Sequence, residues 1–377
     1  MTVKKKHDPL KYVIVLTVLL GLMTAGAIVG RRVYAQQKED RLRAMRDEVN
    51  AENQRIEAEY QQALAQFQSE MSSGANTAWP TQKMEGWDVV DLTNYPLENI
   101  ETMTVNRQEA MYNGMLLVNE WHSRPDDFLE DQLVSVSKAS NRTISVRDNN
   151  VRLFPDAILA LEEALADAKE QNLQYYVAYE GYRSWEEQNR LFQDKMQKFK
   201  DLSTEEQIEK AKKEVNYPGT SEFNTGLTAR MILYKKDDKG INDLPFFASD
   251  QGVWLYENSW KYGLVFRFPL ADYPVKGAQD KSYKTGVSVK LQAFRYVGKG
   301  NAAVMHTLGL CLEEYLDYLM EHPHLAVFED GVLKYEIFRE YVGESDPFVV
   351  QVTRKTGVQN TVVSLDNMGY AILVFEY

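Results

Sequence analysis

The run from Tyr12 to Gly30 most constrains how this chain can fold, because it contains no charged side chain and is rich in Val, Leu and Ile. Its length is close to the roughly 20 residues that cross a bilayer as a helix. Lysines cluster before the run, and Arg31 and Arg32 follow it. Positive charge gathers on the cytoplasmic side of such helices. We therefore predict a cytoplasmic basic tail at residues 1–11, a single-pass helix in the cell membrane at 12–30, and an extracytoplasmic remainder.

A second interpretation of this run stays open. A secretory signal peptide also has a basic start and an apolar segment, and Val33-Tyr34-Ala35 is a conceivable cleavage site. The apolar run is longer than the apolar part of a signal peptide, and two arginines separate it from that site. An uncleaved anchor is therefore favoured.

Residues 31–77 are predicted to form a helical stalk. From residue 36 to about 72 the chain is highly polar and has neither proline nor glycine. Apolar side chains recur there at every seventh position, as in a coiled coil: Leu42, Val49, Ile56 and Ala63. This spacing would allow a homodimer through the stalk. Because Glu52 and Glu59 interrupt the apolar seam, a solvated single helix that lifts the next domain off the membrane is an equal alternative.

The net charge argues against a nucleic-acid-binding protein, and the cysteine count excludes an internal disulfide. Lys and Arg total 43 and Asp and Glu total 55, so the net charge is −12. Nucleic-acid binding would require a basic surface, so no nucleic-acid partner is expected. Cys311 is the only cysteine, so no internal disulfide can form. Its apolar surroundings favour a buried small side chain over a reactive thiol.

The remaining chain mixes helical and strand-like segments. Helical spacing or composition is found at 154–172, 183–215, 253–262 and 300–320. Strand-like runs occur at 173–179 and 294–297, and short alternating strands follow residue 324. This pattern predicts an α+β fold with a small antiparallel sheet flanked by helices. The expected parts are an irregular lead-in (78–114), the main domain (115–325), and a C-terminal β extension (326–377) that forms a subdomain or lengthens the main sheet.

Four phrases in the main domain occur in the order of a known family's motifs. They are Gly181–Gln188, Pro218–Arg230, Trp254–Gly263 with an Arg-Phe-Pro behind it, and Thr285–Gly298. Together they resemble the zinc D-alanyl-D-alanine carboxypeptidase family (VanY-like), whose second and fourth motifs are P-G-x-S-E-H-x-T-G-L-A-x-D and T-G-Y-x-x-E-P-W-H-x-R-Y-V-G. The resemblance covers about residues 116–319 and implies a peptidase-like core. It does not extend to the anchor or the stalk.

The resemblance also implies where an active site would lie, and there the chain departs from the family. The two zinc histidines fall on Phe223 and Ala293, the zinc aspartate on Arg230, and the catalytic glutamate on Lys290. Catalytic zinc needs three side chains that donate an electron pair. We therefore predict a degenerate, catalytically inactive member without zinc or another cofactor. His306 fills none of these positions and is expected on a helix surface.

Arg183, Ser184 and Ser221 are the substrate-binding residues that the resemblance implies. In the family, the arginine grips the free carboxylate of a terminal D-alanine, and a guanidinium fork suits that group. The alternative is that Arg183 serves only in an internal ion pair.

Two new cations distinguish this site from that of the family. Arg230 and Lys290 would stand beside Arg183, and three cations repel zinc and attract an anion. The alternative is that both side chains point outward or pair with nearby acids.

The sequence leaves three functions to compare. The favoured one is a membrane-anchored, extracytoplasmic bacterial pseudoenzyme that binds a peptidoglycan stem peptide or an envelope protein without hydrolysis. The second is an active cell-wall D,D-carboxypeptidase with an atypical metal site. The third is a purely structural envelope module, because fold alone does not establish function.

Overall fold

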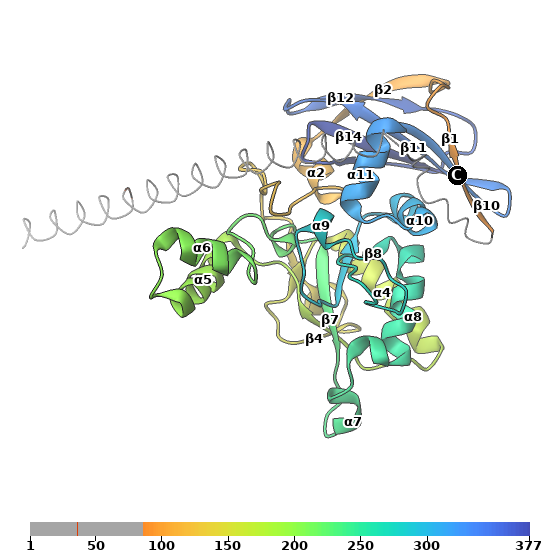
Figure 1. The fold of residues 1–377 in the computed structure, drawn as a ribbon. Coiled ribbons are helices and arrows are strands. Elements are labelled where there is room, and N and C mark those ends of the chain that lie inside the picture. The colour runs from red at the N-terminus through yellow and green to blue at the C-terminus, as the bar shows by residue number, and fades with distance from the viewer. Residues whose placement is uncertain (1–35, 37–85) are drawn as a thin grey trace, which may run out of the picture. The chain divides into compact units, whose positions relative to one another are not determined.

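The computed structural model describes residues 36 and 86–377 (Figure 1). The predicted tail, the transmembrane helix and nearly all of the stalk lie outside the described residues. Within the part of the chain that is described, no helix combines the length and the apolar character needed to cross a membrane.

A five-stranded central sheet carries the motif residues, in the order β4-β6-β7-β9-β8. Only β4 and β6 run parallel, and the other neighbours are antiparallel. Its strands are β4 (Ser145–Val146), β6 (Tyr176–Glu180), β7 (Thr228–Leu233), β8 (Leu264–Phe266) and β9 (Ala293–Tyr296). A short pair, β3 (Val134–Ser135) and β5 (Arg152–Leu153), lies apart from it in the hydrogen-bonding pattern.

Alternation along β7 decides which side chains face the core. Ala229, Met231 and Leu233 enter the main hydrophobic core, where α4 and α8 also contribute buried residues. Because successive side chains of a strand point to opposite faces, Thr228 and Arg230 lie on the other face of the sheet. That face carries the candidate site.

Helices surround the sheet and connect its strands. They are α2 (Arg107–Tyr112), α3 (Val136–Ala139), α4 (Pro155–Glu170), α5 (Trp185–Met196), α6 (Thr204–Lys212), α7 (Lys239–Asn242), α8 (Asp250–Asn258), α9 (Ser282–Thr285), α10 (Lys299–Leu308) and α11 (Leu312–Glu321). Short 3-10 turns are η1 (Gln197–Phe199), η2 (Glu222–Asn224), η3 (Phe246–Ala248) and η4 (Ser259–Tyr262). The expected helices at 154–172 and 253–262 are confirmed as α4 and as α8 with η4. The segment 300–320 divides at Gly309, whose left-handed φ of 67° ends α10.

A second five-stranded sheet is antiparallel throughout, in the order β1-β10-β11-β14-β13. Its strands are β1 (Trp87–Asp91), β10 (His324–Glu329), β11 (Val332–Tyr341), β13 (Asn360–Leu365) and β14 (Tyr370–Glu376), while β2 (Ile100–Val105) and β12 (Phe348–Thr353) form a separate ribbon. Helices α10 and α11 lie between the two large sheets (Figure 1), and their buried faces join the core of the second.

One expectation about the ends of the described chain is wrong, and one pair of alternatives is decided. Residues 86–114 are not an irregular lead-in, because β1 pairs along its whole length with β10 and β2 with β12. Of the two alternatives for the strands after residue 324, the structure contains the separate one: β10, β11, β13 and β14 do not lengthen the central sheet but form a sheet of their own together with β1. The expected single small sheet is therefore two larger ones. Pairings between segments more than 200 residues apart leave no local trace in the sequence.

Candidate functional site

Phe223, Arg230 and Ala293 meet on one face of the central sheet. Phe223 lies in η2, immediately before β7, and is 5% exposed. Arg230 in β7 is the register partner of Ala293 in β9. Phe223 and Ala293 belong to one buried cluster with Phe268 and Val287, which we call the Phe223 cluster. Three of the four positions singled out by the motifs therefore come together, and two of them are packed into an apolar group.

Zinc does not fit the residues at this place. A phenyl ring and a methyl group offer no electron pair, and a guanidinium stays protonated at any ordinary pH. Among the residues that the structure describes, no group of three His, Cys, Asp or Glu side chains is arranged to hold a metal ion.

Arg230 is half-buried and carries no ion pair with any described residue. Its guanidinium carbon lies 5.3 Å from the centre of the Tyr179 ring. Its Nε is buried and has no hydrogen-bond partner within residues 86–377. Arg230 therefore does not pair with a nearby acid of the described chain, which was the alternative expected from the sequence.

Lys290 is exposed, and its Nζ lies 5.3 Å from the centre of the Tyr273 ring. Tyr273 is 8% exposed and packs in the main hydrophobic core, with its hydroxyl close to the Gln292 side chain. Burial raises the pKa of Tyr273 to about 12, although the charge of Arg230 and the nearby Gln292 side chain act to lower it.

Arg183 is held by an internal carboxylate. Its Nε donates to Oε1 of Glu180 at 3.1 Å, and its Nη2 donates to the same oxygen. Its Nη1 donates to Oε1 of Gln188 at 2.5 Å. The guanidinium carbon lies 5.0 Å from the centre of the Phe223 ring. The internal ion pair is therefore the arrangement that the structure contains, and a ligand carboxylate at Arg183 would have to compete with Glu180.

Ser184 and Ser221 both begin short helical segments. The Ser184 hydroxyl accepts from the backbone N–H of Glu187 at 3.1 Å, which caps α5. The Ser221 hydroxyl accepts from the backbone N–H of Phe223 at 3.4 Å and is buried. Their hydroxyl oxygens thus fix the backbone around Arg183 and Phe223.

Glu222 organises a buried charge network directly beside Phe223. One of its oxygens accepts from Nη1 of Arg295 at 2.5 Å, and the other accepts from Nε of Arg267 at 2.8 Å. Arg267 also donates one hydrogen bond to each carboxylate oxygen of Glu313. Burial would raise the pKa of Glu222, but the charges of the two arginines and a bond from Thr228 hold it below the ordinary value. This network fixes the backbone that carries the site.

Sequence inspection missed several of these residues. Gln292 stands next to Ala293 in the fourth phrase, so its position was visible but its lack of a partner was not. Tyr273 lies in the segment between β8 and α9, outside every motif. His306 was expected on a surface, whereas it stacks on the Trp260 ring at 4.7 Å, and burial lowers its pKa to about 4. Cys311 is buried, as expected.

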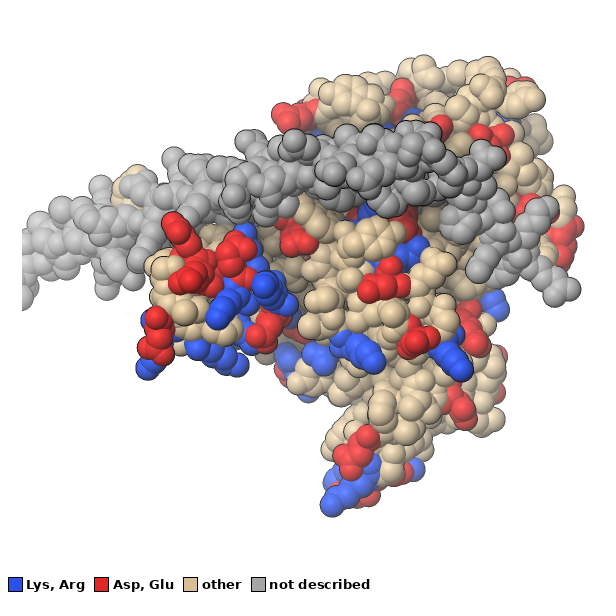
Figure 2. Space-filling model, viewed as in Figure 1, with Lys and Arg blue, Asp and Glu red and all other residues tan. Residues whose placement is uncertain are grey.

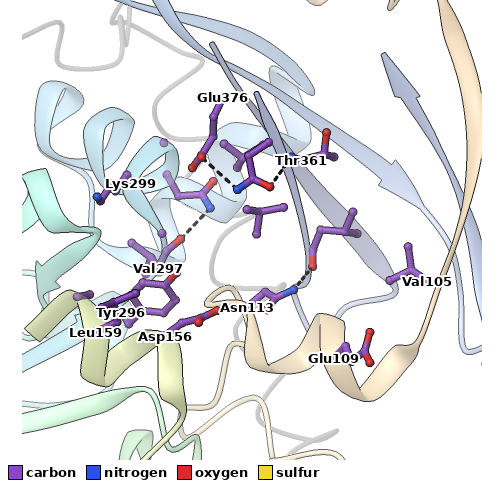
Figure 3. Close-up of a pocket in the computed structure, with 18 of the residues that line it drawn as sticks. Val105, Glu109, Asn113, Asp156, Leu159, Tyr296, Val297, Lys299, Thr361 and Glu376 are labelled. Atoms are coloured by element: carbon purple, nitrogen blue, oxygen red, sulfur yellow. Dashed lines mark hydrogen bonds between the residues drawn. The ribbon is translucent and has the colours of Figure 1, made fainter. Parts of the chain in front are cut away.

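A cavity of about 470 Å³ lies elsewhere, where α2, α4 and the start of α10 face β13 and β14 (Figure 3). Tyr296 lines it from the end of β9 opposite Ala293. The charged residues of its lining are mostly acidic: Glu109, Asp156, Glu163 and Glu376. Lys299, also in the lining, is paired with Glu163 at 3.0 Å. None of the motif positions at Phe223, Arg230, Lys290 or Ala293 lines it.

The charged side chains over α5 and α6 are of mixed sign. Figure 2 shows basic and acidic groups interspersed there, without a continuous basic surface on that face. The net charge of the whole sequence is −12.

Comparison with known proteins identifies the class to which this fold and site belong. The VanY family model, described as D-alanyl-D-alanine carboxypeptidase, matches residues 150–299. VanXYC of Enterococcus gallinarum, a bifunctional D-Ala-D-Ala dipeptidase and D-Ala-D-Ala carboxypeptidase, is 30% identical over 46% of this chain and 82% of its own length. The D-alanyl-D-alanine carboxypeptidase of Enterococcus faecium is 27% identical over 64% of this chain and 69% of its own length.

A solved structure extends the likeness in fold. The vancomycin-resistance D,D-dipeptidase VanXYg, solved with a D-Ala-D-Ala phosphinate analogue, covers 74% of this chain and 99% of its own with a TM-score of 0.54 and 23% identity. The mixed α/β fold is thus a peptidase-type fold. The chain belongs to the VanY D-alanyl-D-alanine carboxypeptidase family.

Proposed function

We propose that this chain is a member of the family that binds its ligand without hydrolysing it, at the outer side of a bacterial cell membrane. The ligand would be a peptidoglycan stem peptide or an envelope protein. One observation carries the proposal: Phe223 and Ala293 are packed together in a buried apolar cluster where the family's motif has its two zinc histidines. An electron-pair donor is missing at both places, so a water molecule cannot be activated there by a metal.

The ligand class is inferred from the relatives. VanXYC is named for action on D-Ala-D-Ala, and VanXYg was solved with an analogue of that dipeptide. The motif residues around the site, including Arg183, Ser184 and Ser221, are those through which a peptide would be held. A stem peptide therefore fits the proposal first, and an envelope protein that presents a similar peptide end is the second candidate.

The loss of metal chemistry can be tested with a matched variant. The full-length chain is analysed for zinc and for D-alanine release from a stem pentapeptide. The variant combines Phe223→His, Arg230→Asp, Lys290→Glu and Ala293→His, which returns the family's donor set. We expect no stoichiometric zinc and no release from the natural chain, and about one zinc per chain in the variant.

The outcomes separate the three functions. D-Alanine release with bound metal in the natural chain would identify an active carboxypeptidase and overturn the proposal. Saturable binding of the pentapeptide without release supports it. Neither release nor binding of a peptide or envelope protein leaves the structural module.

The membrane anchor is tested separately. We propose that residues 12–30 hold the chain in the membrane and that residues 31–77 form the stalk. Deleting residues 12–30 is expected to move the protein from the membrane fraction to the soluble fraction. Mass measurement of the natural chain distinguishes an anchor from a cleaved signal, because cleavage after Ala35 would remove the segment.

A further inference from the structure

One edge of β13 opens into the cavity of about 470 Å³ (Figure 3). This strand is the last in the order of the second sheet, so within the described residues no strand pairs with its outer edge. Thr361, Val362 and Val363 of β13 line the cavity. Such an edge presents unpaired backbone groups and is a template for a further strand. The cavity volume lies in the range of ligand pockets.

A hydrogen bond next to β13 shows which of its residues direct their backbone groups outward. The N–H of Asp366 donates to the C=O of Tyr370, so Asp366 directs its backbone groups at the β14 side. In an antiparallel pair, successive residues direct their backbone groups alternately at the partner and away from it. Counting back from Asp366, Val363 and Thr361 therefore direct theirs at the outer edge.

Side chains satisfy two of these four outward groups. The C=O of Val363 accepts from Nδ2 of Asn113 at 2.8 Å, and the N–H of Thr361 donates to Oδ1 of Asn360 at 2.9 Å. Both contacts agree with the alternation. The C=O of Thr361 and the N–H of Val363 are left without a partner in the described part of the chain. One acceptor and one donor side by side are what an extended peptide bonds when it joins a sheet edge.

The charges in the lining of the cavity are unbalanced. Four carboxylates stand against one ammonium, since Glu109, Asp156, Glu163 and Glu376 share the lining with Lys299. Lys299 is already paired with Glu163. The other three carboxylates make no ion pair within residues 86–377. A concave surface with an excess of one charge concentrates ligands of the opposite charge, so this cavity favours a cation.

Tyr296 and Leu159 add apolar surface beside these acids. The Tyr296 ring lies next to Asp156 in the close-up (Figure 3). Burial and then the charges of Asp156, Glu376 and Glu163 raise the pKa of Tyr296, so the three carboxylates act on one place. An aromatic face attracts an ammonium group, and Leu159, 55% exposed, offers contact for an aliphatic stem. A lysine-type side chain combines such a stem with an ammonium group.

We propose that this cavity binds an extended peptide with a lysine-type side chain, which pairs with the outer edge of β13. The peptide backbone bonds the C=O of Thr361 and the N–H of Val363, and its ammonium group lies among the carboxylates. This second site does not rest on the proposed function, because the Phe223 cluster lies outside the cavity lining.

The test is a titration of the full-length chain at neutral pH by ligand-observed NMR. The probes are acetyl-Ala-Lys-Ala-amide, the same peptide with norleucine in place of lysine, the same peptide with N-methylated backbone amides, and n-butylamine. We expect the lysine peptide to bind, and the norleucine peptide to bind at least about fivefold more weakly because it lacks the ammonium group. N-methylation removes the backbone donors and should weaken binding by about fivefold or more. Added salt should weaken binding of the lysine peptide.

Variants place the peptide in the cavity. Asp156→Asn and Glu376→Gln keep the shape of the side chain and remove a charge, so each should weaken binding of the lysine peptide by about threefold. Leu159→Trp puts a larger ring into the cavity from an exposed position on α4 and should weaken binding by about tenfold or more. Glu170→Gln removes one negative charge from an exposed position on the same helix, outside the cavity, and is the matched control.

Contrary results would identify which part of the proposal is wrong. Equal binding of the lysine and norleucine peptides would overturn the role of the carboxylates. Equal binding of the N-methylated peptide, or butylamine binding as tightly as the peptide, would overturn the pairing with β13. Unchanged binding in Leu159→Trp, or no binding by the natural chain, would overturn the site as a whole.

Two further outcomes would assign the peptide or the cavity differently. Loss of binding in Arg183→Gln alone would place the peptide at the motif residues. Self-association of the natural chain that Leu159→Trp abolishes would make a second copy of the chain the occupant. Either result would overturn the proposal. Zinc content and D-alanine release bear only on the proposed function, so the two failures are distinguishable.

Discussion

At the scale of single residues, Glu222 joins two buried guanidinium groups next to Phe223. It bonds Arg295 and Arg267 from opposite oxygens, and all three side chains are at most 4% exposed. We predict that Glu222→Gln lowers the free energy of unfolding by about 3–5 kcal/mol, because it leaves buried positive charge without its partner. Urea unfolding at pH 7 measures the change.

An exposed ion pair provides the control. Arg354 and Glu101 are also 2.8 Å apart, but each side chain is 60% exposed. Because solvent screens such a pair, Glu101→Gln should lower the free energy of unfolding by less than about 1 kcal/mol. Equal losses in the two variants would contradict the role assigned to Glu222.

The same carboxylate predicts a dependence on pH. The pKa of Glu222 is lowered in the folded chain from its ordinary value of 4.5. A lowered carboxyl pKa contributes stability above the unfolded pKa, and this contribution is lost as the pH falls from about 4.5 through the folded pKa. The natural chain should therefore lose more stability on acidification below that point than Glu222→Gln does.

At the scale of elements, the turn before β7 aims the strand that carries Arg230. Gly226 has a φ of 72°, and an added Cβ would lie 2.5 Å from Leu133 Cδ2 and 2.9 Å from Phe154 Cε2. Gly226→Ala combines a left-handed backbone with overpacking, so we expect a loss of roughly 2–4 kcal/mol in urea unfolding. Gly277 has a φ of 87° with open space around it.

Gly277→Ala therefore tests the effect of the left-handed backbone alone. It should lower the free energy of unfolding by only about 1–2 kcal/mol. If both alanine variants lost the same stability, the contact of Gly226 with Leu133 and Phe154 would not matter.

Elements with local signals were predictable from the sequence. The helix α4 shows its spacing and has a proline at its first position. The break at Gly309 between α10 and α11 was not predicted, because the helical composition continues across it. The meeting of Phe223 with Ala293 was predictable only through the family's motif, since 70 residues separate them. The contact of Lys290 with the Tyr273 ring was not predictable, because Tyr273 lies outside every motif.

At the scale of the whole molecule, residues from both ends of the described chain build one sheet. Strand β1 pairs with β10, and the core of this sheet includes α10 and α11. A second cluster joins Tyr182 and Leu227, which flank the site, with Phe348 and Phe375 of the C-terminal strands. The C-terminal strands are therefore part of the structure that supports the site, although no sequence motif marks them.

The contact between α10 and this sheet gives the prediction for the whole molecule. Gly300 lies in α10, and an added Cβ would meet Val374 Cγ1 at 2.6 Å and the Tyr335 ring at 3.2 Å. Gly300→Ala should therefore cost about 1–3 kcal/mol, although alanine favours a helix. Gly240 in α7 meets only the end of the Asp238 side chain, so Gly240→Ala should be neutral or slightly stabilising.

Urea unfolding followed by tryptophan fluorescence and by far-UV circular dichroism should give one shared transition at lower urea for Gly300→Ala. Two separate transitions, or equal behaviour of the two alanine variants, would mean that the sheet and the central domain are not held together through α10.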